Sequence, residues 1–250
     1  MLVKAVKTRP LIPPKDDLLS VIRESILKLE ERSIIVITSK VVSIWQGRCV
    51  KIIQNSKFKI QKSELIKKEA DFYIDARVVP PAGQIMLTIK DNILIPTSGI
   101  DESNANGYYI LWPEKPFSAA KELYNFIKKE YKLKNFGIII SDSHIAPLRT
   151  GTIGIGLAYY GFNPLRDYRG KKDIFGRKLK FSQTNIVDSL SDAAVYVMGE
   201  GSEQTPIAII EDAGDIEFSE KEFDSLKISI DEDIYSPFLK SVKWKKGSSR

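Results

Sequence analysis

The chain has 250 residues, of which 43% are apolar and 28% are charged, and its formal net charge is +6. This composition is typical of a globular protein with one large or two small domains, and no apolar run approaches the roughly 20 residues that cross a bilayer. Cys49 and His144 are the only residues of their kinds, which excludes intrachain disulfides, cysteine zinc sites and multi-histidine sites.

The N-terminal part of the chain predicts a strand, a loop, a helix and a second strand. Met1–Lys7 alternates apolar and charged residues, as a half-buried strand does. Three prolines follow and exclude a helix, whereas Asp16 or Asp17 can cap a helix that runs to about Glu30. Ser33–Thr38 is a short apolar run typical of buried strands. This order favours a mixed fold of strands and helices.

Polar residues follow two of the expected strands. Ser39 and Lys40 come directly after the run Ser33–Thr38, and a hydroxyl with a lysine at a strand end suits phosphate. A lysine-rich helix is expected over 57–70. Asp101 and Asn104 then lie in a polar loop that could supply a pair of ligands. Read alone, each polar segment is more often an ordinary turn, so both interpretations stay open.

The centre of the chain predicts a helix and then a buried strand that carries polar groups. Pro116–Tyr131 has the apolar spacing of an amphipathic helix. The run Ile138–Ile140 is typical of a buried strand and leads directly into Asp142 and Ser143. Sheets commonly bind ligands at the carboxyl ends of their strands. A carboxylate and a hydroxyl at such an end, with Arg149 nearby, suit a metal ion that carries phosphate.

A glycine-rich apolar segment follows, with glycines at 151, 154, 156 and 161. Their spacing does not match the dinucleotide-binding motif, and the chain has no phosphate-binding loop of the Walker type and no nucleophile elbow. The glycines either expose backbone amides to a ligand or permit close packing. Arg169 comes next, where it can bind an anion or pair with Asp167 or Asp173.

The C-terminal part predicts a regular helix, a buried strand and a basic tail. The helix is expected from about Phe181 to Met198, with Gly199 as its C-cap, and the strand over 206–210. We expect the tail, about 241–250, to be flexible and solvated. Basic and aromatic residues do not interleave as in RNA-binding strands, so nucleic acid is not an expected partner.

Because the single histidine and cysteine leave only oxygen ligands for a metal, Mg²⁺ or Mn²⁺ is the expected ion. The N-terminus lacks the apolar core of a secretion signal, so we expect a cytoplasmic protein without membrane contact.

In combination, these segments resemble the coenzyme F-420-0:glutamate ligase family, whose members are gamma-glutamyl ligases. The resemblance covers roughly residues 1 to 213. Four segments carry it: the loop Ser98–Asn104, the strand end Ile140–Ser143, the stretch Asp167–Leu179 and the helix end Val197–Gly199. Any one of them is weak, but all four in this order are specific.

The resemblance implies roles for particular residues. It places metal ligands at Asp101, Asp142, Ser143 and Glu200, and substrate anions at Arg149 and Arg169. It implies nucleotide contacts at Pro10, Leu11, Ile12, Ser39, Lys40, Asn104, Gly199 and Gly201. Two positions depart from the family pattern. Where the family has a nucleotide-contacting lysine, this chain has Ile44, and Lys40 can substitute for that lysine. Where the family has an arginine, this chain has Ala146.

The resemblance also implies an α+β fold of mixed sheets and packed helices, a single domain over 1–250, and an intertwined homodimer. The implied activity is a GTP- or ATP-dependent ligase. It would phosphorylate a cofactor carboxylate and join the resulting acyl phosphate to L-glutamate. Coenzyme F-420-0 and a folate-like compound are both candidate acceptors. The alternative is a nucleotide-binding regulatory protein of the same fold without ligase activity, which the changes at Ile44 and Ala146 motivate.

Overall fold

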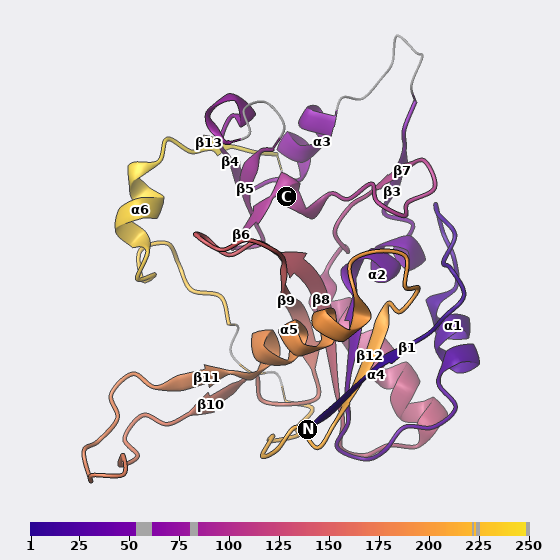
Figure 1. Ribbon diagram of the computed structural model, residues 1–250, viewed down its shortest axis with the longest axis vertical. Coiled ribbons are helices and arrows are strands. Elements are labelled where there is room, and N and C mark those ends of the chain that lie inside the picture. Colours follow the sequence, from indigo (N-terminus) through magenta and orange to yellow (C-terminus); the bar gives the residue numbers. More distant parts are fainter. Residues whose placement is uncertain (54–61, 81–84, 222, 224–225, 249–250) are drawn as a thin grey trace.

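The computed structural model describes residues 1–53, 62–80, 85–221, 223 and 226–248. The predicted mixed α+β class is confirmed. The central feature is a five-stranded sheet with the strand order β1-β12-β2-β8-β9 (Figure 1). The start of the helix expected over 57–70 and the last two residues of the basic tail lie outside the described residues.

The helices of the described chain are α1 (Leu18–Ser25), α2 (Ser39–Gln46), α3 (Lys62–Glu69), α4 (Pro116–Tyr131), α5 (Ile186–Met198) and α6 (Ser236–Ser241). The strands are β1 (Leu2–Val6), β2 (Ile34–Thr38), β3 (Cys49–Lys51), β4 (Phe72–Tyr73), β5 (Leu87–Lys90), β6 (Ile93–Pro96), β7 (Tyr108–Ile110), β8 (Gly137–His144), β9 (Ile153–Tyr160), β10 (Leu165–Asp167), β11 (Gln183–Asn185), β12 (Ile207–Glu211) and β13 (Lys245–Lys246).

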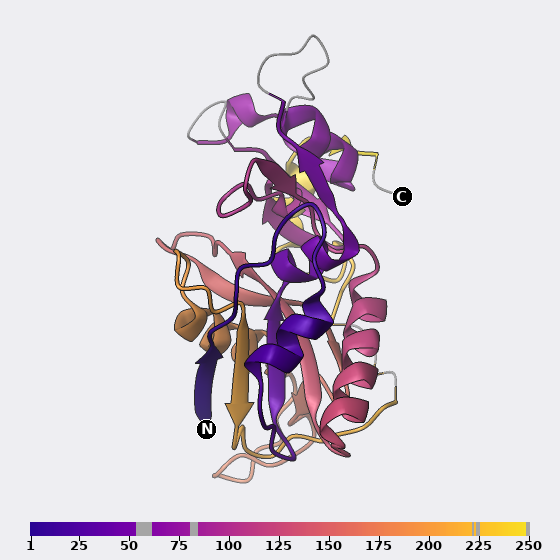
Figure 2. The same cartoon turned by 90° about the vertical axis from the view of Figure 1, so that its right-hand side faces the viewer.

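The central sheet is covered on both faces, which explains its continuous apolar strands. Alternate residues of a strand point to opposite faces. Ile35 and Ile37 of β2 accordingly pack with residues of α1, α2 and α4, whereas Ile34 and Val36 pack with residues of α5. Figure 2 shows α4 on one side of the sheet and α5 on the other. Burial on both faces is typical of parallel pairs, and β2 and β8 are such a pair.

Three smaller units surround this core. β13, β4, β5 and β6 form an antiparallel sheet, and β3 pairs with β7. The third unit is an arm, residues 165–185, in which β10 and β11 project from the body (Figure 1). Within the basic tail, Lys245 and Lys246 pair with β4, so this part of the tail belongs to a sheet.

The glycines of β9 allow α5 to approach the strand closely. A methyl group on Gly154 would lie 2.3 Å from the carbonyl oxygen of Ser191, and the amides of Gly154 and Gly156 donate to Asp192 and Asp188 at 3.0 and 2.9 Å. Since β9 is an edge strand, these carboxylates occupy amides that the sheet leaves unpaired. At these two positions, close packing is the correct interpretation of the glycine pattern.

Two helix boundaries differ from the sequence prediction. α5 begins at Ile186 and not near Phe181, because Gln183–Asn185 pairs with β10 and the Asn185 side chain then caps the helix. α1 ends at Ser25 and not near Glu30, because the backbone is already extended at Ile26. By contrast, α4 spans the predicted residues.

No helix within the described residues is long and apolar enough to cross a membrane.

The contact between α5 and β9 gives a test of the packing. We expect Gly154→Ala to lower the free energy of unfolding by about 1–3 kcal/mol, because the added methyl group meets helix backbone that cannot rotate away. Urea denaturation monitored by circular dichroism measures this change. Thr152→Ala, at an exposed position of the preceding loop, is the control and should stay within about 0.5 kcal/mol. Equal stability of the two variants would contradict the packing argument.

Candidate functional site

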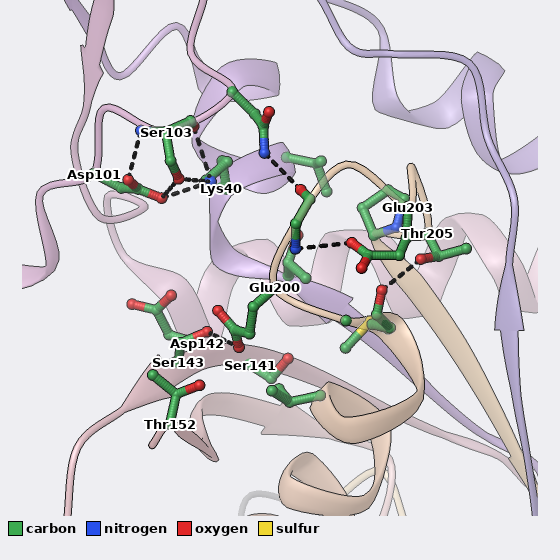
Figure 3. Close-up of a pocket in the computed structure, with 18 of the residues that line it drawn as sticks. Lys40, Asp101, Ser103, Ser141, Asp142, Ser143, Thr152, Glu200, Glu203 and Thr205 are labelled. Atoms are coloured by element: carbon green, nitrogen blue, oxygen red, sulfur yellow. Dashed lines mark hydrogen bonds and ion pairs between the residues drawn. The ribbon is translucent and has the colours of Figure 1, made fainter. Parts of the chain in front are cut away.

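A cavity of about 750 Å³ lies at the carboxyl ends of β2 and β8. Because these strands are parallel and Thr38 pairs with Ser141, the polar residues that follow both strands meet there. The loop between α5 and β12 and the loop after β6 complete the walls (Figure 3). This volume is within the usual range for ligand sites and is large enough for a nucleotide.

Asp142 lies on β8 and lines the cavity. Its Oδ2 accepts a hydrogen bond of 2.5 Å from the indole Nε1 of Trp112, and Ser39 also donates to this carboxylate. Burial raises the pKa of Asp142 to about 6, more than these hydrogen bonds lower it. Among the described residues, no lysine, arginine or histidine side chain forms an ion pair with this carboxylate.

Asp101 lies across the cavity and is held by Lys40. The Lys40 ammonium is 2.5 Å from Oδ2 of Asp101 and also donates to the carbonyl and hydroxyl oxygens of Ser103 at 3.1 Å (Figure 3). Ser103 in turn donates its amide and hydroxyl to Asp101 at 2.8 and 2.9 Å. Burial alone would raise the pKa of Asp101, but the hydrogen bond and charge of Lys40 and the donors of Ser103 outweigh it and lower the pKa.

The loop after α5 brings a third carboxylate to the cavity. Glu200 accepts a hydrogen bond of 2.7 Å from the Ser143 hydroxyl, which joins this loop to the end of β8 (Figure 3). The Asn104 amide donates to the carbonyl oxygen of Gly201 at 2.7 Å, and the Gly201 amide donates to Glu203 at 2.8 Å. These contacts connect the loop after β6 to the loop after α5 across the cavity.

Most residues that the sequence singled out line this cavity. They are Pro10, Leu11, Lys40, Asn104, Gly199, Gly201, Asp101, Asp142, Ser143 and Glu200. Ser39 is buried and reaches the site through its hydrogen bond to Asp142. Ile12 follows Leu11 but is half-exposed and is not among the lining residues.

The two arginines predicted to bind substrate do not line the cavity in this single chain. Arg149 lies in the exposed turn after β8. Arg169 lies on the projecting arm, where its guanidinium pairs with Asp167 at 2.5 Å. The ion pair considered for Arg169 from the sequence is therefore present.

Sequence reasoning missed several residues that contact the predicted site, Trp112 and Glu203 among them. Trp112 reaches Asp142 from 30 positions away, and no local pattern marks it. Glu203 binds the Gly201 amide, and its position in an acidic loop directly after the predicted helix was a usable signal. His144 instead lines a separate cavity of about 270 Å³, with Asp188 and Phe117.

The charged residues that line the main cavity are four carboxylates and one ammonium, a formal charge of −3. No three acidic, histidine or cysteine side chains in the described part of the chain are close enough to bind a metal without other ligands. Mg²⁺, however, is usually bound through one or two carboxylates together with substrate phosphates. Asp101, Asp142 and Glu200, which all line the cavity, can supply the one or two carboxylates that an ion bound in that way uses.

Comparisons with known proteins identify relatives of this chain. A sequence model of the family described as F420-0:Gamma-glutamyl ligase matches residues 7–212. A protein of Methanopyrus kandleri named coenzyme F420:L-glutamate ligase is 32% identical over 79% of this chain and 81% of its own length. Proteins of the same name from Methanocaldococcus jannaschii and Methanosarcina barkeri are 34% and 28% identical, over 74% and 82% of this chain and 77% and 83% of their own lengths.

The raised pKa of Asp142 predicts a pH-dependent stability difference between the metal-free protein and its Asp142→Asn variant. The folded pKa of about 6 lies above the ordinary value of 3.8, so the folded protein binds more protons than the unfolded chain between these values. The wild type therefore loses stability as the pH rises from about 4 to 6, and the variant lacks this loss.

We expect the stability of Asp142→Asn relative to the wild type to increase by about 1–2 kcal/mol between pH 4 and pH 7, a value discounted for partial exposure. Urea denaturation of chelator-treated protein at a series of pH values measures it. A difference that stays constant with pH would show that Asp142 has an ordinary pKa.

Proposed function

The chain belongs to the F420-0:Gamma-glutamyl ligase family, as its motifs predicted, and on that premise we propose that it is a nucleotide-dependent gamma-glutamyl ligase. In the proposed reaction, the terminal phosphoryl group of a nucleoside triphosphate is transferred to a carboxylate of a cofactor. The amine of L-glutamate then attacks the acyl carbon, an amide forms, and inorganic phosphate and a proton leave.

The observation that carries the proposal is the acidic cavity in an otherwise basic chain. Its lining has a formal charge of −3, whereas the whole chain carries +6. A nucleoside triphosphate has several negative charges and would be repelled by such a lining. A polyanion can therefore bind here only together with divalent cations, which is the arrangement that phosphoryl-transfer enzymes use.

The residues around the cavity suit the parts of such a substrate. Lys40 can bind phosphate when its ammonium leaves Asp101, which supports the substitution proposed for the family lysine at Ile44. Ile44 is buried and lines the same cavity, where it provides an apolar wall with Leu11. Asn104 and the backbone of Gly201 offer polar contacts for a base or ribose.

Mg²⁺ or Mn²⁺ would be held by Asp101, Asp142, Ser143 and Glu200. Such an ion, when bound, would neutralise phosphate charge and stabilise the transferred group. The protein's own contribution is to hold these oxygen donors at one end of the sheet. Trp112, Lys40 and Ser143 each orient one of the carboxylates through a hydrogen bond.

Both the acceptor and the nucleotide are proposed as classes. The curated relatives are named for coenzyme F420, so a deazaflavin acceptor is the first candidate, and a folate-like acceptor is the second. GTP and ATP are both candidates for the nucleotide. Arg149 and Arg169 are proposed to bind substrate anions in an assembly of two chains.

The proposed reaction is tested with purified protein, Mg²⁺ or Mn²⁺, GTP or ATP, L-glutamate and a panel of deazaflavin and folate acceptors. We expect a product that is heavier by one glutamyl residue, detected by mass spectrometry. We expect Asp142→Asn to lower kcat by about 10²-fold or more, because it removes a charged ligand of the proposed divalent ion that would stabilise the transferred phosphoryl group. Glu122→Gln, an acid-to-amide change at an exposed position of α4, should leave the rate unchanged.

If no acceptor of the panel yields product although nucleotide binds with metal, the regulatory alternative is favoured over the ligase. Absence of any nucleotide binding would contradict the site assignment itself.

The projecting arm supports the proposal of a homodimer. Ile174, Phe175 and Phe181 on this arm are about 90% exposed, at 91%, 89% and 89%. Several large apolar side chains on one exposed segment are typical of a protein interface. A second copy of the chain is the partner that the family resemblance implies, and it would also bring its own Arg169 toward a neighbouring chain.

We expect sedimentation analysis at micromolar concentration to give twice the mass of one chain. Phe175→Asp should shift the equilibrium toward monomer, because it places a charge in the proposed apolar interface. Leu27→Asp changes an equally exposed apolar residue at the end of α1 and should leave the dimer intact. A wild-type monomer, or equal effects of the two substitutions, would contradict the arm as the interface.

A further inference from the structure

Trp112 is a buried residue that contacts the centre of the site. It follows β7 by two residues, and its side chain is 3% exposed. The indole Nε1 donates to Oδ2 of Asp142 at 2.5 Å, and the backbone carbonyl of Trp112 accepts from Nε of Arg48 at 3.2 Å. Both the ring and the backbone of this residue are therefore held in place.

Apolar side chains and a glycine pack closely around the indole. Its ring packs with Ile95 of β6 and Leu157 of β9 in a small apolar cluster. Gly99 lies against the ring edge, where a methyl group on this glycine would be 1.9 Å from Nε1. Gly99 also has a φ of +68°, a conformation that favours glycine. The backbone thus makes room for an indole whose N–H points at Asp142.

This contact has a specific chemical consequence. An indole nitrogen can only donate a hydrogen bond, so it fixes a carboxylate oxygen and cannot itself bind a cation. Because Trp112 holds Oδ2, the Asp142 carboxylate cannot rotate freely. Its remaining lone pairs can accept from other donors or bind a cation. Hydrogen bonds of this kind to ligating carboxylates usually contribute substantially to metal affinity.

We propose that Trp112 is a positioning residue, whose indole N–H orients the Asp142 carboxylate to bind a divalent cation in the cavity. This inference rests on the proposed metal site. Trp112 lies outside the four segments that carry the family resemblance. Trp112 is not among the residues that line the cavity, so it would act through Asp142.

The experiment is a titration of the full chain with Mn²⁺, with free Mn²⁺ measured by electron paramagnetic resonance, in the presence and absence of a non-hydrolysable nucleotide. Trp112→Phe removes the N–H and keeps most of the apolar ring. We expect its Kd for Mn²⁺ to be about 10-fold higher than that of the wild type.

Leu157→Ala is the matched control, because it loosens the same apolar cluster and keeps the indole N–H. We expect this variant to unfold at a lower temperature than the wild type, with a Kd for Mn²⁺ within about twofold. If Trp112→Phe does not fold, β-(3-benzothienyl)alanine at position 112 provides a second variant, since sulfur replaces the N–H in a ring of nearly the same shape.

The outcomes separate the inference from the function on which it rests. Wild-type binding of Mn²⁺ with an unchanged Kd in the variant without the N–H would overturn the role of Trp112 and leave the metal site standing. An equal loss of affinity in Leu157→Ala would also overturn it, since packing alone would then position Asp142. A wild type that binds no Mn²⁺, even with nucleotide, would refute the proposed metal site itself.

Discussion

The candidate site depends on one constraint, the parallel pairing of β2 with β8 in the middle of the central sheet. This pairing places Thr38 beside Ser141. Lys40, just after β2, and Asp142, near the end of β8, therefore lie at the same edge of the sheet, which the carboxyl ends of the two strands form. Pro206, just before the antiparallel strand β12, accepts a hydrogen bond from the Thr38 amide, which brings the Glu200 loop to that edge as well. Both faces of the pair are buried, so the polar groups of these segments gather at this edge.

The carboxylates at this edge are each held by a donor of the chain, but by donors of different kinds. Asp101 has an ammonium, whereas the side-chain donors to the other two carboxylates are neutral. Asp142 accepts from the Trp112 indole and from Ser39, and Glu200 accepts from the Ser143 hydroxyl. A cation bound at Asp101 must compete with Lys40, but a cation at Asp142 meets no such competitor. In the proposed metal site, charge would therefore favour Asp142 over Asp101 as the first ligand.

The sequence allowed prediction of those parts of the fold that follow from local pattern. The buried strands around Ile34 and Ile138, the helix Pro116–Tyr131 and the polar ends that carry Asp142 could be predicted, because apolar period and strand ends are local signals. The helix at Ser39 and the strand at Gln183 were not predicted, because partners elsewhere in the chain decide them. Trp112 could not be found for the same reason, as its role depends on a contact across 30 residues.

The contact of Trp112 with Asp142 also explains how two separate sheets can build one site. Asp101 follows β6 of the smaller sheet, whereas Asp142 belongs to the central sheet, so the distance between them depends on how these sheets are joined. Ile95, Trp112 and Leu157 form an apolar cluster across this junction, beside Asp142. The segment beyond residue 212, where the family match ends, joins the sheets a second time: Phe218 pairs with Phe162 after β9, and β13 extends the smaller sheet. These contacts at the junction set the separation of the two carboxylates, on which the proposed cation site would depend.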